Sequence, residues 1–100
     1  MADDPGFVSC VTLVESVRGL ESRYEVGAAR IGIMLETLLR LELMRVERAE
    51  VVWCALRRLR SGSGDFPDTL VAELAAAARC HTVYTFDRSA AKHAEMTLLA

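Results

Sequence analysis

The chain has 100 residues, 52% of them hydrophobic, and a formal net charge of -2. This length predicts one small domain, and the hydrophobic content is sufficient for a buried core, which excludes a disordered chain. The charge excludes a globally basic nucleic-acid binder, although arginines gathered in the second half leave a local basic face open.

Cysteine usage and hydropathy indicate a cytoplasmic protein. Cys10, Cys54 and Cys80 form no CxxC pair, and we expect them to be small buried hydrophobes in a reducing compartment. No apolar run is long enough to span a membrane, and residues 1–6 form a short polar leader rather than a signal peptide. We therefore expect no membrane partner.

The first half predicts a strand, two helices and a second strand. Residues 7–10 form a short apolar run that indicates a buried strand, and residues 11–24 then change to helical spacing. Residues 28–40 repeat the helical pattern, so these two segments predict an antiparallel helix pair. Residues 41–46 alternate weakly and predict a short strand.

The second half predicts two helices followed by short strands around one helical turn. An amphipathic segment is interrupted by serines and glycines, and an alanine-rich segment follows with Pro67 in its first turn. In chain order we expect an amphipathic helix over 50–60, an alanine-rich helix over 67–78, a buried strand over 82–85, a helical turn over 89–93 and an edge strand over 96–99.

This order of elements predicts an α/β domain with a parallel sheet over residues 1–100. A helix followed by a strand brings Asp68, near the start of the helix, and Asp87, just after the strand, to one end of that sheet. Ligands bind there in α/β proteins. Paired acids at such a place indicate a hard metal ion and hydrolysis.

Each candidate acid also has a structural alternative. Asp65 precedes the alanine-rich helix, and Asp68 lies near its start. Capping requires only one of these two acids, so the other is available for a second role. Asp87 is equally suited to cap the turn that follows it. Glu15 lies at the edge of a buried helical stripe, where an acid is either a boundary residue or a carboxylate with a function.

Three segments together resemble a known family. Residues 7–20 (FVSCVTLVESVRGL), 65–72 (DFPDTLVA) and 83–88 (VYTFDR) resemble the PIN-domain ribonucleases, specifically the VapC-like toxins of bacterial toxin–antitoxin pairs. The resemblance implies a three-layer α/β/α fold with a parallel sheet. It also implies a homodimer, a cognate antitoxin as partner and RNA as substrate.

The resemblance implies a role for each acid. In that family a quartet of acids binds one or two Mg²⁺ or Mn²⁺ ions that activate water for attack on an RNA phosphodiester. By position, Glu15 resembles the second acid, Asp68 the third and Asp87 the fourth, with Asp65 a reserve metal ligand and Thr85 a hydroxyl neighbour. Clustered carboxylates of this kind require a cation between them.

The resemblance also shows a departure. The family opens with a buried strand that ends in an Asp, whereas no apolar run precedes Phe7. We therefore expect a PIN-like domain without its first strand, first acid and first helix, with weak or absent cleavage. Two alternatives follow: a non-catalytic remnant whose helix pair over 11–40 dimerises or binds the antitoxin, and an α/β domain whose acids only cap helices.

Overall fold

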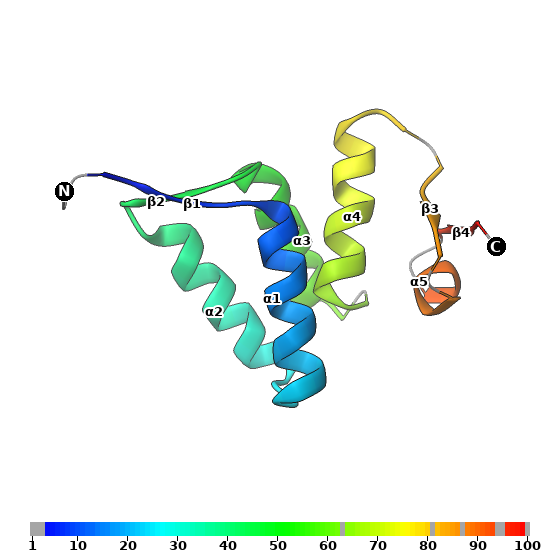
Figure 1. The fold of residues 1–100 in the computed structure, drawn as a ribbon, viewed down its shortest axis with the longest axis horizontal. Coiled ribbons are helices and arrows are strands. Elements are labelled where there is room, and N and C mark those ends of the chain that lie inside the picture. Colours follow the sequence, from blue (N-terminus) through cyan, green and yellow to red (C-terminus); the bar gives the residue numbers. More distant parts are fainter. Residues whose placement is uncertain (1–3, 63, 81, 87, 94–95, 100) are drawn as a thin grey trace.

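The computed structural model describes residues 4–62, 64–80, 82–86, 88–93 and 96–99 (Figure 1). Helices dominate this part of the chain, and the strands are short. In chain order the elements are β1 (Gly6–Val8), α1 (Cys10–Arg23), α2 (Ala28–Arg40), β2 (Met44–Val46), α3 (Ala49–Arg60), α4 (Phe66–Ala77), β3 (Tyr84–Thr85), α5 (Arg88–His93) and β4 (Thr97–Leu98).

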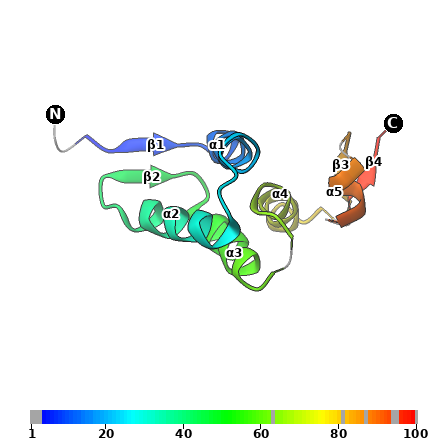
Figure 2. The same ribbon diagram turned by 90° about the horizontal axis from the view of Figure 1, so that it is seen from below.

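Helix α3 lies at the centre of the core. It packs against α2 on one side and α4 on the other, and α1 packs against α4 (Figure 2). Val52 and Leu56 of α3 are 0% exposed, as are Phe66 and Leu70 of α4. Each pair is four residues apart, which places its side chains on one helix face. Full burial of one such side chain stabilises the fold by roughly 1.5–3 kcal/mol.

Helices α1 and α2 run in opposite directions, as predicted, but they are not closely packed (Figure 1). An apolar cavity of about 350 Å³ lies between them, with Leu13 and Val17 on one wall and Ile31 and Leu35 on the other. Each helix makes its main contacts with another element, α4 for α1 and α3 for α2. The expected helix pair therefore has an open apolar interface.

The strands pair in parallel, as predicted, and the α/β class is confirmed. In the described chain, β1 pairs with β2 and β3 pairs with β4, forming two separate two-stranded sheets. The expectation that residues 7–10 and 82–85 form buried strands is wrong, because Phe7 is 68% exposed and Tyr84 is 60% exposed. A two-stranded sheet has no interior strand, so its side chains stay accessible.

The turn between α3 and α4 depends on glycine, as its composition predicts. Gly62 has a φ of +83° and Gly64 a φ of +100°, a region that glycine adopts at no steric cost. The backbone N–H of Gly62 donates to the carbonyl oxygen of Leu59 at 3.1 Å, which satisfies one of the last carbonyl groups of α3. This turn ends α3 and sets the start of α4.

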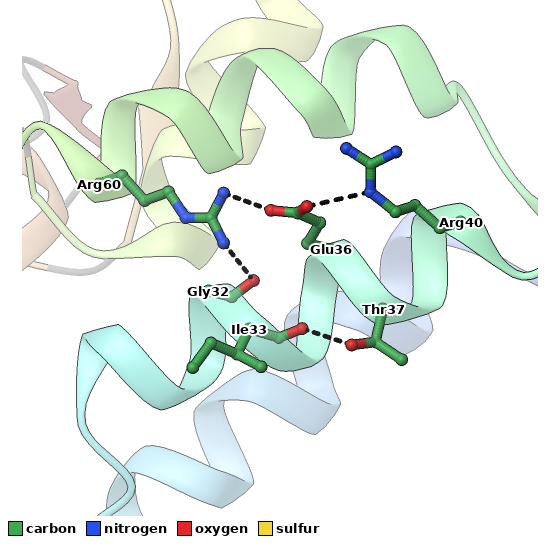
Figure 3. A network of polar contacts seen from close by, with 6 residues as sticks. All are labelled: Gly32, Ile33, Glu36, Thr37, Arg40 and Arg60. Atoms are coloured by element: carbon green, nitrogen blue, oxygen red, sulfur yellow. Dashed lines mark hydrogen bonds and ion pairs between the residues drawn. The ribbon is translucent and has the colours of Figure 1, made fainter.

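An ionic network joins α2 to α3 (Figure 3). The Glu36 carboxylate accepts hydrogen bonds from Arg60 Nη1 at 2.6 Å and from Arg40 Nε at 2.9 Å. Arg60 Nη2 also donates to the carbonyl oxygen of Gly32 at 3.3 Å. The guanidinium carbon of Arg40 lies 5.3 Å from the ring centroid of Trp53, within range of a cation–π contact. Arginines on the polar faces therefore connect the helices to each other.

The three cysteines differ in how far they are buried. Cys10 is buried, Cys54 is half-buried and Cys80 is exposed, so the expectation of buried cysteines is wrong for Cys80.

In the part of the chain that the structure describes, no helix is both long enough and apolar enough to cross a membrane.

Candidate functional site

Asp65 caps helix α4. Its backbone is extended, with φ -85° and ψ 161°, and its carboxylate accepts a hydrogen bond from the backbone N–H of Asp68 at 2.9 Å. Pro67 lies in the first turn, where its missing N–H leaves no intrahelical bond unmade. Of the two capping alternatives open in the sequence, the structure selects Asp65, so the Asp68 side chain is not the cap.

Asp68 is a buried carboxylate paired with an arginine from another helix. The residue is 8% exposed, and its Oδ1 lies 3.1 Å from Nη2 of Arg18 on α1. Packing of α1 against α4 brings these two residues together across 50 positions of sequence. A buried carboxylate requires a compensating charge, and the Arg18 guanidinium together with the N-terminus of α4 provides it.

Glu21 adds a third carboxyl group to this region. Burial raises the pKa of the Glu21 carboxyl group above its ordinary value. The negative charges of Asp65 and Asp68 also raise this pKa, whereas the positive charge of Arg18 lowers it. The Glu21 carboxyl group therefore interacts electrostatically with both acids at the start of α4.

Glu15 lies on α1 one helical turn before Arg18 and is exposed. It lines an open hollow of about 580 Å³ together with Arg18, Ser22 and Tyr24. Its neighbours Leu13 and Val17 are buried, so Glu15 lies at the edge of the apolar stripe, as predicted. Its role as a metal ligand stays a prediction.

The fourth-acid position, Asp87, lies outside the described residues, so its pairing with Asp68 stays a prediction. Thr85 ends β3, and α5 begins at Arg88.

The acids at the start of α4 have the chemistry, but not the number, of a complete metal site. Oxygen ligands such as those of Asp65 and Asp68 suit hard divalent cations, and Arg18 already places a positive charge against Asp68. Among the described ranges, no three His, Cys, Asp or Glu side chains are arranged so that they could hold a metal ion. The described part of the chain therefore holds no complete metal site, and the cationic group that contacts Asp68 in it is Arg18.

Sequence reasoning missed Arg18 and Glu21 at this site. Glu15, Arg18 and Glu21 follow one another at intervals of three residues, which places them on neighbouring parts of one helix surface. That spacing was visible in the sequence. Only the packing of α1 against α4 shows that Arg18, from this surface, contacts Asp68.

Comparison with known proteins gives one family. The sequence profile described as PIN domain matches residues 1–96, a range that contains Glu15, Asp65, Asp68 and Asp87. No curated protein and no solved structure matches the chain significantly.

Proposed function

Because this chain belongs to the PIN domain family, whose members are generally of nuclease type, we propose that it acts as a metal-dependent endoribonuclease of the toxin–antitoxin class. The observation that supports this proposal is the buried Asp68 carboxylate, which is not the cap of α4 and which contacts a cationic group. A residue with only a capping role has no need of burial against a positive charge from another helix.

The proposal assigns the metal ligands to Glu15, Asp68 and Asp87, with Asp65 in reserve. PIN domains typically use divalent metals, and we propose Mg²⁺ or Mn²⁺. Such an ion supplies Lewis-acid activation of water and neutralises phosphate charge. Within the chain, Asp65 fixes the first turn of α4, and this turn holds the Asp68 carboxylate toward α1, where Arg18 adds positive charge.

RNA cleavage by the purified chain tests this function. We expect only weak cleavage, because the first acid is absent, and this cleavage should require Mg²⁺ or Mn²⁺. Asp68→Asn should reduce it by more than the roughly 10–100-fold that loss of an outer-shell partner costs, because a first ligand is removed. Glu42→Gln is the matched control, since it removes an exposed acid from a turn and should leave the rate unchanged. Cleavage that survives chelation of the metal, or that survives Asp68→Asn, contradicts the proposal.

The apolar cavity between α1 and α2 favours a second function, a non-catalytic module that dimerises or binds a cognate antitoxin. Its wall includes Met34, which is 43% exposed, together with Leu20 and Leu38. Exposed apolar side chains around an apolar cavity are typical of a protein interface.

Light scattering and co-purification with the cognate antitoxin test the second function. Met34→Asp should abolish dimer formation or antitoxin binding because it places a charge in the apolar wall, whereas Thr37→Asp, on α2 but outside that wall, should not. Binding without any metal-dependent cleavage supports the module over the enzyme. A monomer that binds no antitoxin contradicts it.

A further inference from the structure

One side of α3, together with the end of α2, gathers arginines around an aromatic ring. Trp53, Arg57 and Arg60 follow one another on α3 at intervals of four and three residues, which places them on one side of that helix. Arg40 of α2 joins them, because its guanidinium carbon lies 5.3 Å from the centroid of the Trp53 ring. We name these four residues the α2–α3 arginine face.

The acids of this region do not neutralise the arginine face. Arg40 and Arg60 share one carboxylate, that of Glu36 (Figure 3). Within the described residues, the Arg57 guanidinium donates to a thiol sulfur at 3.1 Å and contacts no carboxylate. Glu50, an acid on the same side of α3, is already paired with an arginine that precedes the helix. The face therefore carries more positive than negative charge.

The arginines of this face are accessible and keep hydrogen-bond donors for a ligand. The Arg40 and Arg60 side chains are 67% and 45% exposed. Among the described contacts, Arg40 donates to Glu36 through Nε only, whereas a guanidinium has five N–H donors. An open hollow of about 220 Å³ lies between Arg40 and Arg60, and Ile33 and Thr37 also line it. An anionic group can thus reach both guanidinium groups without movement of the helices.

We propose that the α2–α3 arginine face binds the backbone of single-stranded RNA, with phosphates on its arginines and a base stacked against Trp53. This inference rests on the proposed ribonuclease function, and it adds a surface that holds the substrate apart from Asp68. Guanidinium groups match phosphate oxygens in bidentate hydrogen bonds. An aromatic ring stacks on any base, so its place among arginines favours RNA over an acidic protein segment.

Binding of a fluorescein-labelled oligouridylate to the full chain tests this surface. A chelator is present, so that metal-dependent cleavage does not consume the RNA. We would measure the Kd by fluorescence anisotropy at several salt concentrations. Arg40→Gln and Arg57→Gln should each raise the Kd and reduce the slope of the logarithm of affinity against the logarithm of salt concentration by about 0.7, the value for one phosphate contact on a single strand.

The control is Arg79→Gln, which removes the same charge from an exposed position just beyond the end of α4. It should leave the salt slope unchanged. Arg57 makes no ion pair with another helix in the described chain, so Arg57→Gln should keep the α2–α3 interface intact. A loss of RNA binding in Arg57→Gln is then not explained by a loss of folding, which circular dichroism checks.

Trp53 is the single tryptophan of the chain, so its fluorescence reports base stacking directly. Oligouridylate should quench this fluorescence. Trp53→Leu keeps an apolar side chain against the core and should raise the Kd without a change in the salt slope, because stacking releases no counterions. Unquenched fluorescence at saturating RNA overturns the stacking role.

The other outcomes separate this inference from the proposed function. If oligouridylate binds but Arg40→Gln and Arg57→Gln keep both Kd and slope, the arginine face is overturned, and the cleavage assay still decides the nuclease function. If oligoglutamate binds as tightly as oligouridylate and displaces it, the face fits an acidic protein and the RNA assignment is overturned. If the variants behave as expected but the chain cleaves no RNA with Mn²⁺, the nuclease function fails and the RNA-binding face stands.

Discussion

Asp65 and Asp68 show how backbone conformation gives the same side chain two different roles within one turn. The extended backbone of Asp65 lets its short side chain reach the amide of Asp68. Asp68 already has helical geometry, so its carboxylate projects from the helix and meets Arg18 of α1. One carboxylate stabilises the helix end, and the other forms an ion pair with an arginine of another helix.

Substitution of Asp65 separates capping from metal binding. Asp65→Ala should lower the free energy of unfolding by about 1 kcal/mol because the first turn loses its side-chain acceptor, and Asp65→Ser should restore most of it. Urea denaturation measures both. Asp65→Ser also removes the carboxylate, so an unchanged Mn²⁺ affinity in that variant assigns Asp65 to capping alone. A stability loss in Asp65→Ser as large as in Asp65→Ala contradicts the capping role.

Among the elements, α2 and α3 are joined by polar as well as apolar contacts. Ile31 and Leu35 of α2 are buried, and on the neighbouring polar side Glu36 binds Arg60 across the interface and Arg40 within its own helix. The hydrogen bond from Arg60, and then that from Arg40, lowers the pKa of the Glu36 carboxyl below its ordinary value. The stability that this α2–α3 interface contributes should therefore decrease in acid.

Glu36 should make stability fall in acid. Its folded pKa is lower than its unfolded value of about 4.3, so its contribution is fully present above that pH and is lost as the pH falls through the folded pKa. At pH 7, Glu36→Gln should have a lower urea midpoint than the unaltered chain. At a pH of about 3, the difference between the two midpoints should be smaller. Glu42→Gln, an exposed acid with no ion pair in the described chain, is the control. An equal deficit at both values of pH contradicts the ionic role.

The whole molecule divides into a helical core and a C-terminal segment. Buried residues of the core cluster come from α1 to α4, whereas β3, α5 and β4 make their main contacts with one another. Among the residues after Cys80 whose burial the structure describes, Met96 alone is buried. The radius of gyration is 14.0 Å, above the roughly 13 Å of a compact domain of this length. Few apolar contacts therefore stabilise the C-terminal segment.

Hydrogen exchange should reveal this division. The Thr97 amide, which donates to the Val83 carbonyl oxygen at 2.7 Å, should exchange at least about tenfold faster than the Leu56 amide of α3, because opening β4 exposes little apolar surface. Native-state exchange followed by NMR measures both amides in one sample. Equal protection of Thr97 and Leu56 would show that the chain opens as one cooperative unit.

Local pattern was sufficient for most of the helical fold. The range predicted for α2, residues 28–40, is the observed one, and α1 differs from its predicted range by one residue at each end, because capping and apolar periodicity are local properties. Strand burial was mispredicted at Phe7 and Tyr84, because a strand's exposure depends on which elements cover it.

At the candidate site, the sequence by itself determined that Asp65 and Asp68 stand at the start of a helix and that Glu15 lies at the edge of an apolar stripe. Only the tertiary structure decided that Asp65 is the cap and that Asp68 pairs with Arg18. The physical reason is that an ion pair across 50 residues forms only when two helices pack, and the packing is set by apolar burial across the whole core.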